Sequence, residues 1–92
     1  MIPVREVAPR AVTSLLREQP LTTAKVQFAW RASVGPAMAR ATAVDLAADG
    51  TLHVAADSKH WRKETARSVA VIVRRLRELL GRGVVKRIAV KG

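Results

Sequence analysis

After a lead-in at residues 1–8, expected to be flexible, the chain enters a segment in which apolar residues recur with helical spacing. Between Ala11 and Leu16 they follow the i, i+1, i+4, i+5 pattern of an amphipathic helix. Pro20 comes directly after this segment, and proline is typical of the position after a helix end. The pattern therefore predicts a first helix over residues 10–19.

A second helix is predicted for residues 21–34, where apolar residues recur every four positions on one face. This stripe consists of Val26, Trp30 and Val34. The hydroxyl of Thr22 or Thr23 can begin the helix by accepting a hydrogen bond from an otherwise unpaired backbone N–H. Gly35 can end it, because glycine tolerates the left-handed conformation that is common after a helix. A further short turn is expected at residues 37–41.

Residues 42–56 predict a β-hairpin, and its register follows from the apolar positions. A two-residue turn would place the large apolar residues of the two strands on opposite faces. A three-residue loop, residues 48–50, instead gives one uniformly apolar face, which burial selects. The pairs on that face are Leu46 with Leu52 and Val44 with Val54. This register requires Gly50 in the left-handed conformation, making a bulge, and leaves Asp45 and His53 on the wetter face.

The longest apolar pattern starts after Asp57 or Ser58, either of which can cap a helix, and ends before Gly81. Its apolar side consists of Trp61, Thr65, Val69, Ile72, Leu76, Leu79 and Leu80. Trp61 has charged neighbours, but it points the same way as the leucines, so we expect it in the core. The alternative is a partly exposed ring at the rim of the sheet that stacks on a nucleic-acid base.

A final strand is predicted for residues 84–91, after a short loop at residues 82–83. Ile88 and Val90 are expected to face the core. Lys86 shares their parity and would therefore point inward, which is unusual for a lysine.

The order helix, helix, strand, strand, helix, strand predicts a single α+β domain over residues 1–92, with a three-stranded sheet covered by helices in two layers. The residues expected in its structural core are Trp30, Val34, Gly35, Leu46, Leu52, Val54, Trp61, Val69, Ile72 and Leu76.

Charge is distributed unevenly along the chain. Residues 1–58 carry six basic and five acidic side chains, whereas residues 59–92 carry eleven and two. The net charge of +10 favours an acidic partner, with nucleic acid first and an acidic protein or membrane surface behind it. The basic residues expected to contact nucleic acid are Lys59, Arg62, Lys63, Arg67, Arg74, Arg77, Arg82, Lys86 and Arg87. Alternatively, these side chains only keep the domain soluble.

Residues suited to catalysis or metal binding do not form a recognisable set. Neither His53 nor His60 has a second ligand at metal spacing, and Ser58 is better explained as a helix cap than as a nucleophile. The sequence contains no phosphate-binding glycine motif and no cysteine. We therefore expect a protein that is not an enzyme and uses no cofactor, metal or small-molecule substrate.

The sequence contains no apolar run of membrane-spanning length, and its first residues do not form a secretory signal. The absence of cysteine suits a reducing compartment. We expect a cytoplasmic protein, associated with the nucleoid and without a membrane partner.

Three segments carry a shared pattern. The first has W-x-x-x-V-G at Trp30, Val34 and Gly35. The second has D-G-x-L-x-V at Asp49, Gly50, Leu52 and Val54, and runs on to Trp61 at the start of a helix. The third has L-x-x-x-L-G, then a strand ending in I-x-V. In this order and spacing, over about residues 21–91, they resemble the DciA family of bacterial proteins that work with the replicative helicase.

The resemblance implies a KH-like domain that binds single-stranded or forked DNA, contacts the hexameric replicative helicase during loading, and hydrolyses no nucleotide itself. A KH domain clamps nucleic acid with a G-x-x-G loop, which this chain lacks, so we expect binding driven by charge. The leading hypothesis is a DNA-binding accessory protein of bacterial replication. The alternatives are a protein-interaction adaptor whose basic face meets an acidic partner, and an RNA-binding KH-like module.

Overall fold

The computed structural model describes residues 20–91, so the helix predicted for residues 10–19 lies outside the described residues. The described elements are α2 (Thr23–Val34), α3 (Pro36–Arg40), β1 (Thr42–Leu46), β2 (Thr51–Ala56), α4 (Lys59–Arg67), α5 (Val69–Leu80) and β3 (Arg87–Lys91). No helix within residues 20–91 is long and apolar enough to cross a membrane.

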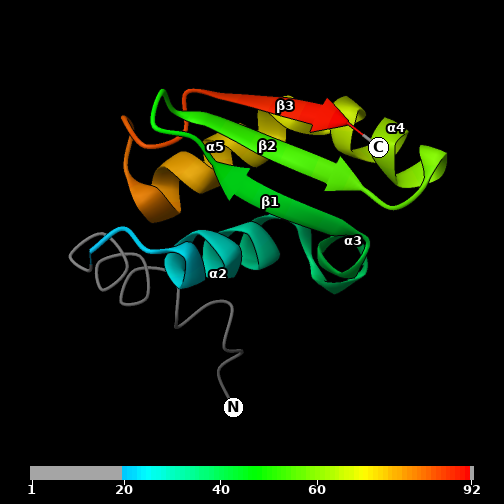
Figure 1. Ribbon diagram of the computed structural model, residues 1–92, viewed down its shortest axis with the longest axis horizontal. Coiled ribbons are helices and arrows are strands. Elements are labelled where there is room, and N and C mark those ends of the chain that lie inside the picture. The colour runs from blue at the N-terminus through cyan, green and yellow to red at the C-terminus, as the bar shows by residue number, and fades with distance from the viewer. Residues whose placement is uncertain (1–19, 92) are drawn as a thin grey trace, which may run out of the picture.

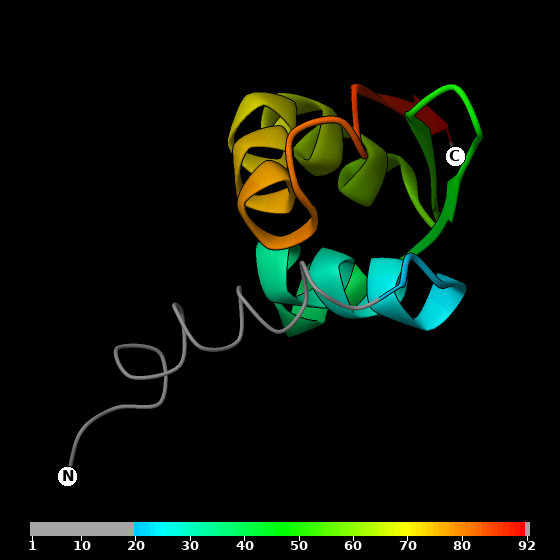
Figure 2. The ribbon, with the colours of Figure 1, turned by 90° about the vertical axis from the view of Figure 1, so that its left-hand side faces the viewer.

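The three strands form one mixed sheet in the order β1-β2-β3, antiparallel between β1 and β2 and parallel between β2 and β3. Helices α4 and α5 lie behind one face of the sheet, and α2 runs beside β1 (Figure 1). Figure 2 shows the sheet on one side of the molecule, α4 and α5 on the other, and α2 along the bottom. The predicted α+β class, with three strands in a layer packed by helices, is confirmed.

The core lies between the central strand and the helices. Its buried members are Val26, Ala29, Trp30, Leu52, Val54, Ile72, Leu76, Leu80 and Val85, and Val34 and Leu46 pack against them while partly exposed. The Trp30 ring is 3% exposed, and its Nε1–H donates to the Thr42 hydroxyl at 2.9 Å. That hydroxyl donates in turn to the Met38 carbonyl at 2.7 Å. The indole is therefore buried without leaving its polar atom unpaired, as burial requires.

The hairpin has the predicted register. Leu46 pairs with Leu52 and Val44 with Val54, and Asp45 lies opposite His53. Gly50 has a φ of 88°, and its N–H donates to the Ala47 carbonyl at 3.0 Å, closing the turn. Apolar burial on one face thus identified both the loop length and the position that needs glycine.

At both predicted helix starts, where two capping residues were possible, the structure identifies one. The Thr22 hydroxyl accepts from the backbone N–H of Lys25 at 3.1 Å, and the Ser58 hydroxyl accepts from that of Trp61 at 3.2 Å. Gly35, which was expected in the core, serves instead as the C-cap of α2 with a φ of 84°, and a Cβ there would meet no atom within 4 Å. Its role is conformational rather than one of packing.

The long helix predicted after the hairpin is wrong as a single element, because it ends at Arg67 and restarts at Val69. The Thr65 hydroxyl donates to the Trp61 carbonyl at 2.7 Å, and such bonds within a helix compete with its backbone ladder. Ser68 then caps α4, with its N–H shared between two carbonyls. The apolar side predicted for one continuous helix therefore does not extend unchanged from α4 into α5.

The break corrects two core assignments. Trp61 and Val69 are only partly buried, and neither belongs to the core cluster or to the apolar residues packed against it. Trp61 instead packs edge-on against the neighbouring His60 ring, with 5.0 Å between ring centroids. Of the proposed stripe, the fully or nearly buried positions are Thr65, Ile72, Leu76 and Leu80.

The last strand begins three residues later than predicted, at Arg87. The turn at residues 82–84 shifts the alternation, so Val85 is fully buried and Lys86 is exposed. The Lys86 alkyl chain lies against Gly50, where an added Cβ would come within 2.7 Å of it. The inward lysine expected from strand parity is therefore wrong.

We predict that Trp30→Ala destabilises the domain by about 3–5 kcal/mol, because it removes a buried ring and leaves a cavity. Trp61→Ala is the matched control, and it should cost less than half as much because that ring is partly exposed. Urea denaturation followed by circular dichroism measures both. Equal losses would contradict the placement of the two rings.

We predict that Gly50→Ala lowers the free energy of unfolding by about 1–2 kcal/mol, because alanine disfavours positive φ. The new Cβ would also crowd Lys86. Gly83→Ala is the control, since an added Cβ there meets nothing within 4 Å. Thermal melting of both variants measures the difference, and an unchanged melting point for Gly50→Ala would oppose this account of the turn.

Candidate nucleic-acid interface

The first group of basic side chains lies on α4. Lys59, Lys63 and Arg67 are four residues apart, so they follow one row along the helix, and all three are exposed. We call this set the α4 basic row. Arg67 also forms an exposed ion pair with Glu64, at 3.6 Å, which contributes little to stability and leaves the guanidinium accessible. Arg62, on another side of the helix, is half-buried.

The second group surrounds a depression beside α5. Arg74, Arg77 and Arg82 line a hollow of about 600 Å³, together with Glu78 and apolar side chains of the helix. We call this the arginine hollow. The two arginines on α5 are three residues apart, and the turn after Gly81 brings Arg82 to the same place. Three of the predicted contact residues therefore line one hollow.

The end of α5 suits these cations. Arg77 lies in the last turn of the helix, where the backbone carbonyls give the helix dipole its negative end. The Gly81 N–H donates to the Arg77 carbonyl at 2.9 Å and ends the helix. The negative end of the dipole offsets part of the repulsion of Arg77 by Arg74 and Arg82, which the positive end at a helix start would not do.

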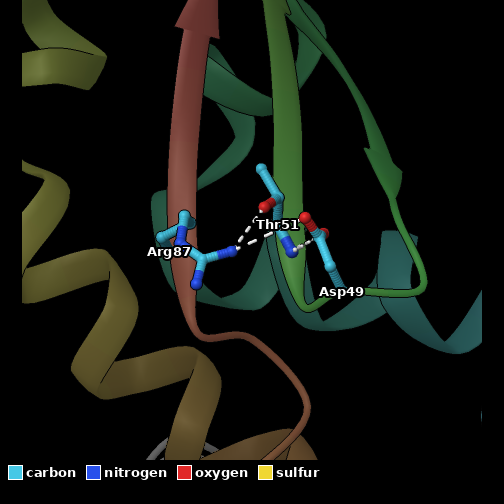
Figure 3. Close-up of polar contacts among 3 residues, drawn as sticks. All are labelled: Asp49, Thr51 and Arg87. Carbon is cyan, nitrogen blue, oxygen red and sulfur yellow. Dashed lines mark hydrogen bonds and ion pairs between the residues drawn. The ribbon is translucent and has the colours of Figure 1, made fainter.

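Arg87 is positioned differently from the other predicted contacts (Figure 3). Its guanidinium donates to the Thr51 hydroxyl at 2.8 Å and lies 3.7 Å from the Asp49 carboxylate. The backbone N–H of Thr51 donates to Asp49 at 2.9 Å, and this bond, assisted by the Thr51 side chain and Arg87, holds the pKa of Asp49 below its usual value. Arg87 joins the hairpin to β3, so a phosphate would compete with Asp49 for it.

Arg75 has a structural role that sequence reasoning missed. Its Nη1 donates to the Ser33 carbonyl at 2.8 Å, tying α5 to the end of α2. Arg75 is a neighbour of Arg74 but lies about 100° around the helix from it, so the wheel could have separated the two arginines.

The nine residues predicted to contact nucleic acid, all within the described chain, thus fall into separate groups. The structure gathers Arg74, Arg77 and Arg82, aligns the α4 basic row, and assigns Arg87 to a local contact. Lys86 is exposed and directly precedes β3. Within residues 20–91, no group of three or more acidic, histidine or cysteine side chains could hold a metal ion.

Comparison with known proteins gives one match. A family model described as "Dna[CI] antecedent, DciA" matches residues 3–90. No curated protein and no solved structure matches the chain. Because the family match covers nearly the whole sequence, this protein belongs to the DciA family, and a role related to loading the replicative helicase follows from that membership.

Proposed function

We propose that this protein is a non-enzymatic DNA-binding accessory factor of bacterial replication, which contacts single-stranded or forked DNA through the arginine hollow and the α4 basic row. The observation that carries this proposal is the convergence of Arg74, Arg77 and Arg82 on one hollow. Contact with the replicative helicase is the second part of the proposal, and family membership supports it.

Phosphate is the ligand that these side chains fit best. A guanidinium presents a planar fork of donors that matches two phosphate oxygens, and such charge-assisted bonds are stronger than neutral ones. The salt bridges found within residues 20–91 involve Arg67 and Arg87, and none involves the three arginines of the hollow. Glu78 also lines the hollow, so a phosphate bound there would meet one carboxylate as well as three guanidinium groups.

The expected mode of binding has little sequence preference. Phosphate contacts position a protein on DNA but carry no base identity. Trp61 is partly exposed, but it lies on the side of α4 opposite Lys59 and Lys63, so base stacking on its ring would be a contact separate from the α4 basic row. An acidic protein surface is the competing ligand for the same cations, and the experiments below separate the two.

Titration with salt tests the electrostatic mode. If about five basic residues contact phosphates, the slope of log affinity against log salt concentration should be near −3.5 for single strands and near −4.5 for duplex DNA. Fluorescence anisotropy with a labelled oligonucleotide at several salt concentrations measures it. A slope close to zero would remove the proposal.

Charge reversal tests which surface binds. The triple variant Arg74→Glu, Arg77→Glu, Arg82→Glu should weaken binding to single-stranded DNA by about tenfold or more and make the salt slope shallower by about 2. The matched control reverses three exposed cations elsewhere, Arg31, Arg40 and Lys91, with the same change in net charge.

The control should bind DNA more tightly than the hollow variant. Equal losses in the two variants would mean that net charge alone drives binding. A pull-down with the replicative helicase, with and without DNA, completes the test. If the hollow variant loses the helicase but keeps DNA, the basic face is a protein-binding surface instead.

A further inference from the structure

The two edges of the sheet have different surroundings. The outer edge of β1 faces α2, which contacts that strand. The outer edge of β3 lies at the margin of the described chain in both Figure 1 and Figure 2, and no described element lies beyond it. An uncovered edge strand can pair with another extended chain.

The hydrogen-bond pattern shows which β3 groups face outward. The Ala47 N–H donates to the Thr51 carbonyl, so alternation directs the backbone groups of Leu52 and Val54 toward β3. On β3, the Arg87 N–H donates to the Gly50 carbonyl at 3.3 Å, which is the first contact of the parallel ladder. The groups of residues 87, 89 and 91 therefore face β2.

It follows that the N–H and C=O groups of Ile88 and Val90 point outward. Neither residue has a backbone hydrogen bond to a helix or loop within residues 20–91. The edge offers two donors and two acceptors in alternation, which another strand satisfies in full. The side chains of Ile88 and Val90 are also partly exposed, so apolar area remains to be covered.

Positive charge flanks this apolar centre at both ends. Lys86 precedes it and Lys91 follows it, both exposed, whereas Arg87 is already paired with Asp49 and Thr51. If a second copy of the chain paired antiparallel, the Lys86 end of one strand would lie opposite Lys91 of the other. If it paired parallel, each cation would lie opposite the same cation of the other copy. Directly opposed like charges disfavour strand pairing. A phosphate backbone could use the outward N–H groups but not the outward carbonyls.

We propose that the β3 edge binds, by strand addition, an extended polypeptide segment of a partner protein that has apolar residues at its centre and acidic residues on both sides. Backbone pairing would supply affinity, and the flanking charges would select the acidic segment. This surface lies on β3 and is separate from the arginine hollow, so the proposal does not depend on DNA binding there.

The test uses a synthetic peptide, acetyl-EEVTVEE-amide, added to isotope-labelled protein. Nuclear magnetic resonance should show the amides of Ile88 and Val90 shifting on titration, and their hydrogen exchange slowing by about tenfold at saturation, because outward N–H groups become paired. A peptide of the same charge that cannot form a strand, acetyl-EEGPGEE-amide, should leave their exchange unchanged. Equal effects of both peptides would reduce the interaction to charge and overturn the proposal.

A substitution separates the edge from the rest of the fold. Val90→Pro removes an outward N–H that the β2–β3 ladder does not use, and proline is tolerated at such edge positions. Val90→Ala shortens the same side chain but keeps the N–H. The proline variant should lose most of its affinity for the peptide, and the alanine variant should retain it. Equal affinities of the two variants would contradict strand pairing.

Circular dichroism checks that the proline variant is folded. If it is not, the wild-type protein is titrated with the peptide N-methylated at its central residues, which removes the peptide's own donors. This peptide should not bind, and unchanged binding would overturn the proposal. A single-stranded oligonucleotide serves as the last comparison. If it protects Ile88 and Val90 from exchange as well as the peptide does, the edge is a nucleic-acid surface and the proposal fails.

Discussion

Burial of the central strand β2 is the interaction on which the described fold depends. Leu52 and Val54 are fully buried, and they are held between the strands on either side and the helices behind them. Ile72 and Leu76 of α5 and Trp30 of α2 complete the same cluster. Each of these side chains contributes on the order of 2 kcal/mol by leaving water, which is large against the margin of a small domain. The cations lie outside this cluster, so binding chemistry and stability are largely separate.

Much of the architecture was predictable from local chemistry. The hairpin register followed from matching apolar positions. The residue types that accept hydrogen bonds at helix starts narrowed each cap to two neighbouring residues, and the structure selects Thr22 and Ser58. These features depend on residues close in sequence, where one physical rule dominates. The gathering of Arg74, Arg77 and Arg82 was foreseen as a shared sign of charge, but not as a hollow.

The errors arose where two rules competed. Periodicity alone continued the helix through Ser68, whereas the hydroxyl of Thr65 and the cap at Ser68 divide it, which moves Trp61 out of the core. Parity alone turned Lys86 inward, because it could not reveal that the strand begins only at Arg87. The contact of Arg87 with Asp49 and Thr51 joins residues far apart in the sequence, and no spacing rule indicates it.

The parallel pairing of β2 with β3 has a consequence for how the domain forms. Thr51 lies opposite Arg87, so the chain must pass through α4 and α5 before the sheet can close. Closing so long a connection costs entropy before the strand contacts compensate for it, which slows folding relative to a hairpin. During synthesis the hairpin and the helices can assemble first, but Leu52 and Val54 stay open on one side until residues 87–91 have left the ribosome.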